Sequence, residues 1–179
     1  MSDIFDRVTE QQDFFKKIVS KIPGFQGYID RVHRRDADKI LREGIADLFQ
    51  KHWERISQLQ RDIIAAGKID LVDDLESSAV KLRQFIDRIR TASYGYAGFF
   101  DALKINSEEL TRVYQYDLEL LSLSDDVSLA IDNVEASLES DGLPAALRNL
   151  RTQSQACVEA YEQRDKVMRN VAAEPPVSE

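Results

Sequence analysis

The sequence is poor in the residues that make turns and cross-links. Its 179 residues include only seven glycines, four prolines and one cysteine. A β-rich domain of this size needs many more turn residues, so the scarcity of Gly and Pro favours few turns and long helices. The single Cys157 allows no disulfide within the chain, which fits a reducing compartment.

Long apolar runs are also missing. No stretch approaches the roughly 20 apolar residues that are needed to span a bilayer. The beginning of the chain is acidic and polar, where a signal peptide would be basic and then apolar. We therefore expect a soluble protein of the cytoplasm.

Residue types that build catalytic or metal sites are scarce. The two histidines, His33 and His52, lie on one predicted helix and are too far apart to share a metal ion. The sequence contains no phosphate-binding loop, dinucleotide-binding fingerprint, HExxH motif or CxxC motif. We therefore predict no enzyme activity, no metal and no cofactor.

Charge is distributed unevenly along the chain. Residues 1–90 hold 17 basic and 16 acidic side chains, whereas residues 91–179 hold 7 basic and 16 acidic ones. Proteins bind nucleic acids through clustered Lys and Arg side chains that contact phosphates. The acidic second half therefore argues against a nucleic-acid partner, and solubility explains it more simply.

Apolar residues recur at alternating spacings of three and four, which is the pattern of helices packed in a bundle or coiled coil. In one stretch this pattern continues without interruption from Leu71 to Leu103, so Gly95 and Gly98 are expected to be helical. The sequence predicts four long helices, which span about residues 29–66, 70–104, 107–140 and 143–171.

Short connections make neighbouring helices run antiparallel. We therefore predict an all-α fold, an up-down-up-down antiparallel bundle of four long helices with an additional N-terminal amphipathic helix over residues 3–22. Pro23, Gly24 and Gly27 end that helix and form a hinge. The predicted domains are the N-terminal helix with its Pro/Gly hinge, the four-helix bundle and a disordered tail, at residues 1–28, 29–171 and 172–179.

Polar residues on the apolar seams are expected to meet inside the bundle. Residues equally distant from a turn between antiparallel helices lie at the same level, and this count brings Asp117 level with Arg164. The candidate buried polar layer consists of Arg42, Tyr94, Asp117 and Arg164, with Tyr96 close by. Its simplest interpretation is a buried ion pair completed by tyrosine hydroxyls. The alternatives are a polar ligand-binding pocket and a catalytic site.

The segment RVHRRDADKILR, residues 31–42, concentrates basic side chains. Such a run on a helix can bind phosphates or anionic lipid. Because Asp30, Asp36 and Asp38 interrupt it, we expect instead a solvated face whose charges pair with one another.

The stretch TASYGYAGFFDALK, residues 91–104, alternates aromatic residues with small ones. Small residues let another helix approach closely, while the rings fill the space beside it. The stretch therefore forms either an internal contact, for example with helix 3–22, or an exposed aromatic groove for a partner. The candidate partner surface combines it with the apolar face of the N-terminal helix and comprises Phe5, Phe15, Ile18, Tyr94, Tyr96, Phe99 and Phe100.

Two stretches carry a resemblance to a known family. GFQGYIDRVHRRDADKILRE (residues 24–43) and IRTASYGYAGFFDALKINSEEL (residues 89–110) resemble a pattern of uncharacterised all-helical bacterial proteins. The resemblance implies a helical fold and a bacterial origin, and it implies no activity.

The expected function is a non-catalytic protein–protein interaction or scaffold module. Its expected partner is another protein or a second copy of the chain in a dimer. One alternative is a peripheral membrane-associated protein that uses the N-terminal helix, although helix 3–22 carries no net charge to attract anionic lipid. The second alternative is a small-molecule sensor that uses the polar layer inside the bundle.

Overall fold

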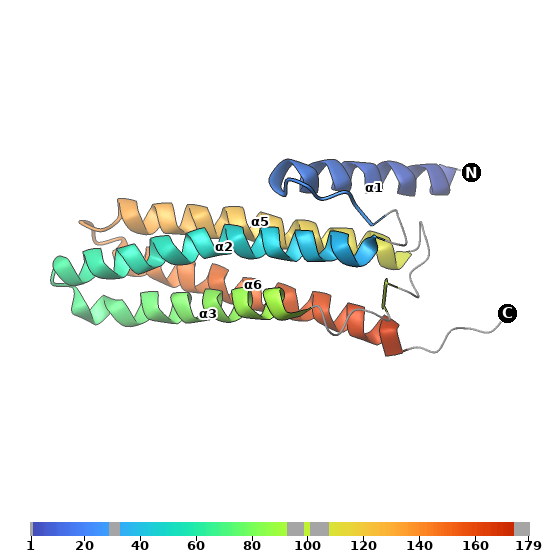
Figure 1. The fold of residues 1–179 in the computed structure, drawn as a ribbon. Helices are drawn as coiled ribbons and strands as arrows, with labels where there is room; N and C mark the ends of the chain where they lie inside the picture. The colour runs from blue at the N-terminus through green and yellow to red at the C-terminus, as the bar shows by residue number, and fades with distance from the viewer. Residues whose placement is uncertain (1, 29–32, 93–98, 101–107, 174–179) are drawn as a thin grey trace. The chain divides into compact units, whose positions relative to one another are not determined.

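The computed structural model describes residues 2–28, 33–92, 99–100 and 108–173 (Figure 1). Within these ranges the chain is helical and contains no β-strand. The described ranges contain five α-helices, and a 3-10 helix, η1 (Ile69–Leu71), follows the second of them. The α-helices are α1 (Ser2–Lys21), α2 (Arg34–Ala65), α3 (Val72–Thr91), α5 (Glu108–Ala136) and α6 (Leu143–Ala173). The prediction of an all-α chain is confirmed for the described residues.

Most helix ends lie within a few residues of their predicted positions. The end of α2 is set by Gly67, whose φ of 74° belongs to the left-handed region that glycine adopts without strain. Its N–H donates to the carbonyl of Ile64 at 3.0 Å, which closes the helix. The start of α3 is later than predicted, because Asp70 lies within η1 and does not cap the long helix. Most of the predicted continuation to residue 104, including Gly95 and Gly98, lies outside the described residues.

The chain divides into two compact units, and each contains parts of several helices. Unit 1 comprises Met1–Ile45, Ile89–Leu121 and Ala160–Glu179, and unit 2 comprises Ala46–Arg88 and Ser122–Glu159. Unit 1 therefore contains α1 and the first part of α2. The predicted domain boundaries at residues 28 and 171 stay predictions.

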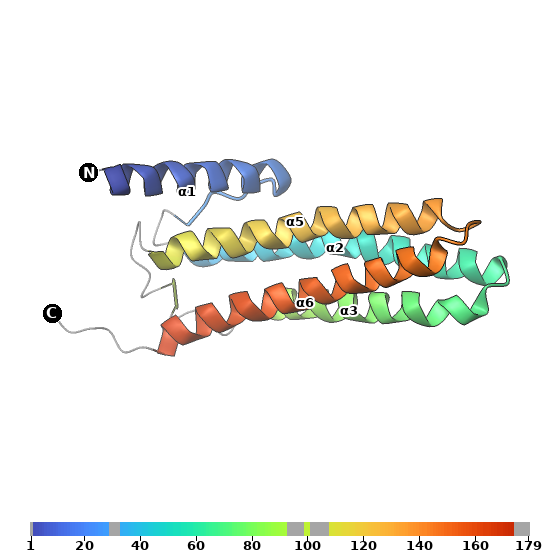
Figure 2. The same ribbon diagram turned by 180° about the vertical axis from the view of Figure 1, so that it is seen from behind.

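Unit 2 is built on the apolar seams of four helices, with a core that includes Ile56, Leu59, Ile63, Leu75, Leu82, Val127, Ile131, Val134, Leu147 and Leu150. The ring of Phe49 on α2 meets that of Phe85 on α3 edge to face, with the centroids 4.6 Å apart. Figure 2 shows from behind how a short turn joins α5 to α6. Lys68, beside η1, donates from Nζ to the carbonyl of Leu138 and so ties the two turns of this unit together.

Unit 1 buries the segment that follows α1. Four apolar or aromatic side chains of this part of the chain are at most 3% exposed, namely Ile18, Ile22, Phe25 and Tyr28. They share the core of unit 1 with Leu41, Ile45, Ile89, Phe99, Phe100, Leu110, Val113, Tyr114, Tyr161 and Met168. The hinge and the residue that follows it therefore contribute two large aromatic rings, Phe25 and Tyr28, to the core.

Candidate functional site: a buried network of charged side chains and tyrosines

The centre of unit 1 contains an ion pair between two helices. Arg164 of α6 donates from Nε to Oδ1 of Asp117 on α5 at 2.8 Å. Both side chains are at most 1% exposed. Each stands on the apolar seam of its helix, so packing of the two seams brings the charges together.

Asp38 of α2 extends this pair into a network. Its Oδ1 accepts a hydrogen bond of 2.8 Å from Nη2 of Arg164, and its Oδ2 accepts one of 2.6 Å from Nε of Arg42. Arg42 also donates from Nη1 to the carbonyl of Ile89 in α3 at 3.0 Å. Four helices thus meet in one buried layer.

Tyr28, which follows the hinge, closes the network on the side of α1. Its hydroxyl donates to Oδ2 of Asp117 at 2.8 Å, and its backbone N–H donates to the hydroxyl oxygen of Tyr114 at 2.9 Å. Arg34 donates from Nε to the carbonyl of Tyr28 at 2.7 Å. The ring of Tyr28 also stacks on that of Phe100, with the centroids 5.7 Å apart. Tyr28 is therefore held through its backbone, hydroxyl and ring.

Burial sets the electrostatics of this layer. It raises the pKa of Asp117, and the positive charge of Arg164 opposes that rise. Burial, and then the negative charge of Asp117, raise the pKa of Tyr28 well above its ordinary value of 10.0. Tyr28 therefore remains a protonated donor at neutral pH, and its hydroxyl and Arg164 together solvate the Asp117 carboxylate. An arrangement in which buried charges bond to one another suits a structural role.

The structure brings together three of the four residues of the predicted polar layer. Arg42, Asp117 and Arg164 join through shared carboxylates, while Tyr94, like Tyr96, lies outside the described residues. Sequence reasoning missed Tyr28 and also Asp38, which had been assigned to a solvated face. That assignment was wrong for Asp38, because its side chain is buried. A signal for Asp38 was available, since it precedes Arg42 by four residues and an acid and a base at that spacing meet on one helix face.

The predicted partner surface is not an exposed surface in unit 1. Ile18 and Phe99 are fully buried, and Phe100 is 2% exposed. Phe15 is half-buried, and its ring lies 6.2 Å from that of Phe25. The ring of Phe25 in the hinge contacts that of Phe15, and the ring of Tyr28 stacks on that of Phe100. Tyr94, Tyr96 and the side chain of Phe5 lie outside the described part of the structure.

Unit 2 contains a smaller polar contact at His52. The ring Nε2 shares a hydrogen bond of 2.9 Å with the hydroxyl of Ser124 on α5. The ring also meets Phe49 edge to face, with the centroids 5.8 Å apart. Burial lowers the pKa of His52 from its ordinary value of 6.5, and the positive charge of Arg55 lowers it further. The folded chain therefore favours the neutral imidazole.

We expect His52→Gln to reduce the sensitivity of folding to mild acid. The unfolded imidazole takes up a proton below about pH 6.5, whereas the folded one resists protonation. The contribution of neutral His52 to the free energy of unfolding is therefore fully present above that pH and is lost as the pH falls. Urea unfolding at about pH 7.5 and about pH 5.5 should show a larger loss in the wild type than in His52→Gln. Because His33 is present in both proteins, their difference reports His52. Equal losses would contradict the assignment.

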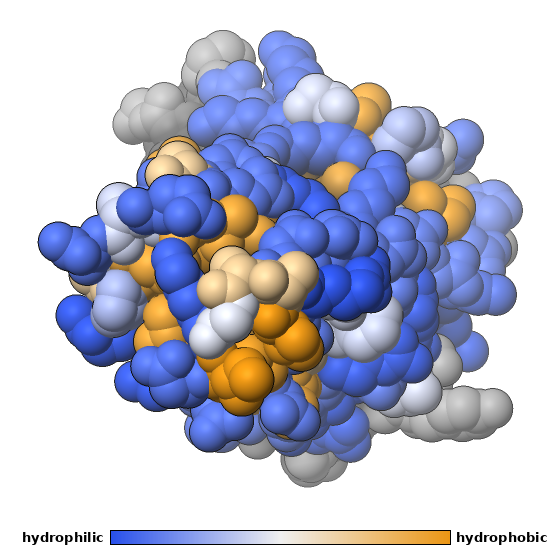
Figure 3. Space-filling view, turned by 90° about the vertical axis from the view of Figure 1, so that its left-hand side faces the viewer, coloured by the Kyte–Doolittle hydropathy of each residue, from blue (hydrophilic) through white to orange (hydrophobic). Residues whose placement is uncertain are grey.

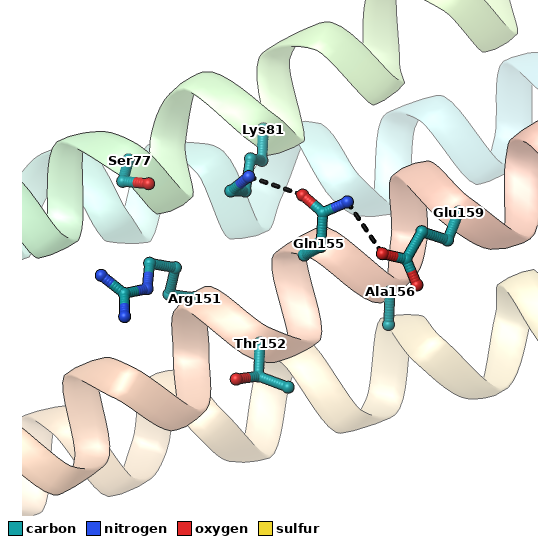
Figure 4. Close-up of a pocket in the computed structure, with 7 residues that line it drawn as sticks. All are labelled: Ser77, Lys81, Arg151, Thr152, Gln155, Ala156 and Glu159. Carbon is teal, nitrogen blue, oxygen red and sulfur yellow. Dashed lines mark hydrogen bonds between the residues drawn. The ribbon is translucent and has the colours of Figure 1, made fainter.

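A shallow groove of about 400 Å³ lies between α3 and α6 in unit 2 (Figure 4). Lys81 donates from Nζ to Oε1 of Gln155 at 2.5 Å, and Gln155 donates from Nε2 to Glu159 at 2.9 Å. Arg151, which also lines the groove, donates to Asp74 at 2.9 Å. The charged groups that line the groove thus bond to neighbours on α3 and α6. This favours a solvated polar surface over an anion-binding site.

The described residues contain neither a candidate metal site nor a candidate membrane-spanning helix. No group of three or more His, Cys, Asp or Glu side chains there has an arrangement that could hold a metal ion. Among the described helices, none combines the length and the apolar character that crossing a membrane requires.

Comparison of the chain with family models gives no match. Comparisons with curated proteins and with solved structures also give no significant match. These results agree with a resemblance that carries no assigned activity, and a bacterial origin stays a prediction.

Proposed function

We propose that this chain is a non-catalytic protein–protein interaction or scaffold module. The observation that carries the proposal is an apolar surface at one end of unit 2, where α2 ends and η1 begins. Ile64 is 52% exposed and Ile69 is 68% exposed. Leu71 and Val72 beside them are half-buried. These four side chains form the apolar end of unit 2.

The apolar end lies at the end of unit 2 that Figure 3 views. Figure 3 shows hydrophobic residues gathered on this face of unit 2, surrounded by hydrophilic ones. The half-buried Leu138 belongs to the neighbouring turn, which Lys68 ties to η1. Single exposed apolar residues are normal on a protein surface, but a contiguous patch with a polar rim is typical of an interaction site.

The polar groups inside unit 1 support a role without catalysis. Asp38, Asp117, Arg42 and Arg164 are bonded to one another and to backbone carbonyls. A ligand for a sensor site would have to replace these bonds, at the cost of leaving buried charges exposed to an apolar core. The membrane alternative is weakened for a different reason: Ile18 of α1 is buried in unit 1 and does not face a membrane surface.

We also infer the directions in which the four long helices run. In unit 2, His52 and Arg55 of α2 bond to Ser124 and Ser128 of α5, so residue numbers rise together along the two helices. Asp74 and Lys81 of α3 likewise bond to Arg151 and Gln155 of α6. These offsets support α2 parallel to α5 and α3 parallel to α6. Since short turns follow α2 and α5, successive helices then alternate in an up-down-up-down order.

The test uses matched surface variants. The purified chain, which we expect to be cytoplasmic, is used to capture a protein from an extract of its organism of origin, and binding of the captured protein is then measured by calorimetry. The variant Ile64→Ser/Ile69→Ser should weaken binding at least tenfold, because apolar contacts at the centre of an interface dominate its affinity. The control Val80→Ser/Leu129→Ser changes two side chains of similar exposure, 60% and 59%, elsewhere in unit 2. It should bind like the wild type, and equal binding by both variants would contradict the proposal.

A further inference from the structure

α2 carries a notch that receives the end of α1. A Cβ atom placed on Gly44 would lie 2.7 Å from Cγ2 and 2.9 Å from Cδ1 of Ile22, closer than carbon atoms approach. Ile22, the first residue after α1, is 2% exposed. Glycine is disfavoured inside a helix, so its presence here has a packing reason. Gly44 makes the space into which Ile22 inserts.

The contact between α1 and the rest of unit 1 is narrow. Among the α1 side chains described, which begin at Gln12, Ile18 alone is fully buried. Phe14 and Phe15 are half-buried, and the others are exposed. Ile18 and Ile22 are one helical turn apart, and a backbone hydrogen bond of 2.8 Å from the N–H of Ile22 to the carbonyl of Ile18 fixes their spacing. They form a compact docking element.

The hinge joins this element to a second anchor. Gly24 and Gly27 have φ values of 88° and 81°, in the left-handed region that favours glycine. Beyond them, Tyr28 is fixed by its bonds to Tyr114 and Asp117. Between them, the ring of Phe25 contacts those of Phe15 and Tyr28, with centroid distances of 6.2 and 5.3 Å. The torsions between residues 22 and 28 and the packing of Phe25 therefore set the relation of the docking element to the Tyr28 anchor.

We propose that two copies of this chain exchange α1 reciprocally, so that Ile22 of one copy fills the Gly44 notch of the other. The occupant follows from the structure, because the notch already holds this helix and a second copy brings the same side chains at the same spacing. Exchange preserves the buried contacts of Ile18 and Ile22, whereas the hinge opens and its buried Phe25 has to repack. The contact uses unit 1, so it goes beyond the proposed function, which uses the apolar end of unit 2.

Disulfide trapping tests the exchange directly. The Cβ placed on Gly44 lies 3.6 Å from that of Ile22, within the roughly 3.5–4.5 Å found between disulfide-bonded residues. A chain with Ile22→Cys and Gly44→Cys is unfolded, refolded and oxidised at micromolar and at near-millimolar concentration. The native Cys157 is buried, and burial raises its pKa to about 12, so it does not compete.

Exchange predicts a covalent monomer at low concentration and a covalent dimer at high concentration on a non-reducing gel. The crossover is expected on the order of millimolar, the effective concentration that a short linker gives the attached helix. A monomer at both concentrations would overturn the proposal. The control chain carries Ile22→Cys with Ile69→Cys, a more exposed position in unit 2. If the control forms as much dimer, the cross-links come from random collision and the proposal also fails.

A second measurement needs no cysteine and follows the oligomeric state of otherwise wild-type chains by light scattering. Gly24→Ala strains the bent hinge through its φ alone, because a Cβ there meets nothing within 4 Å. Opening the hinge relieves that strain, so we expect about a tenfold gain in dimerisation constant for each hinge opened. Gly67→Ala imposes the same strain, at a φ of 74° and also with open space, in a turn that exchange does not use. Equal dimerisation of the two variants would refute the exchange.

Discussion

Asp117→Ala is expected to lower the free energy of unfolding by about 3–5 kcal/mol, the usual effect of breaking a buried ion pair. The change removes the acceptor for Nε of Arg164 and for the hydroxyl of Tyr28, which are bonded to it at 2.8 Å each. Both donors remain buried in unit 1 without that carboxylate, so fewer hydrogen bonds offset their desolvation. Urea unfolding followed by circular dichroism measures the loss.

Asp74→Ala is the matched control for this prediction. Asp74 accepts a hydrogen bond from Arg151 at 2.9 Å, but the two side chains are 31% and 47% exposed. Exposed ion pairs contribute roughly 0–1 kcal/mol, because water solvates both charges when the pair is broken. A loss for Asp117→Ala no greater than that for Asp74→Ala would show that the buried network does not stabilise unit 1.

Tyr28→Ala should destabilise the chain by about 3–5 kcal/mol, since it leaves a cavity where a fully buried ring had been. The ring touches Phe25, Phe100 and Tyr114, with centroid distances between 5.1 and 5.7 Å. Tyr28→Phe keeps these contacts and removes only the donor to Asp117. Its expected cost is about 1–3 kcal/mol, the price of leaving a buried acceptor with one partner fewer. Chemical denaturation of the two variants separates packing from hydrogen bonding.

Tyr116 provides the comparison for Tyr28. It lies on α5, close to the network in sequence, but its side chain is only half-buried. Tyr116→Ala should therefore cost no more than about 1 kcal/mol. If Tyr28→Ala were as mild as Tyr116→Ala, the segment after α1 would not be part of the core of unit 1.

The sequence predicts the helices well because their signal is periodic and local. The alternation of three and four persists through each helix, so the spans of α2, α5 and α6 follow from it. Counting from the turn near residue 141 places Asp117 and Arg164 at one level, and the structure joins them at 2.8 Å. That count works because both residues lie on helices joined by a short turn, where distance along the chain measures height.

The rest of the network depends on contacts that such counting does not reach. Tyr28 follows two glycines with left-handed backbone torsions, and no periodic pattern says where a bent segment will place its next side chain. Asp38 carries the signal of an i, i+4 pair with Arg42, but that spacing is the same on exposed and buried faces. The contact that shows Asp38 to be interior comes from Arg164 on α6, 126 residues away.

The separation of the network residues along the chain has a consequence for folding on the ribosome. Asp38 and Arg164 are 126 residues apart, whereas the contacts of Arg55 with α5 in unit 2 span 73 to 80 residues. Contacts distant in sequence form late, because a long loop must close before they can be made. The nascent chain can therefore bring Arg55 to α5 before Arg164 is synthesised. Until Arg164 arrives, Asp38 has its neighbour Arg42 one turn away at 2.6 Å as a local partner. Unit 1 is thus the last part to be completed, because it combines residues from the start of the chain with residues from its end.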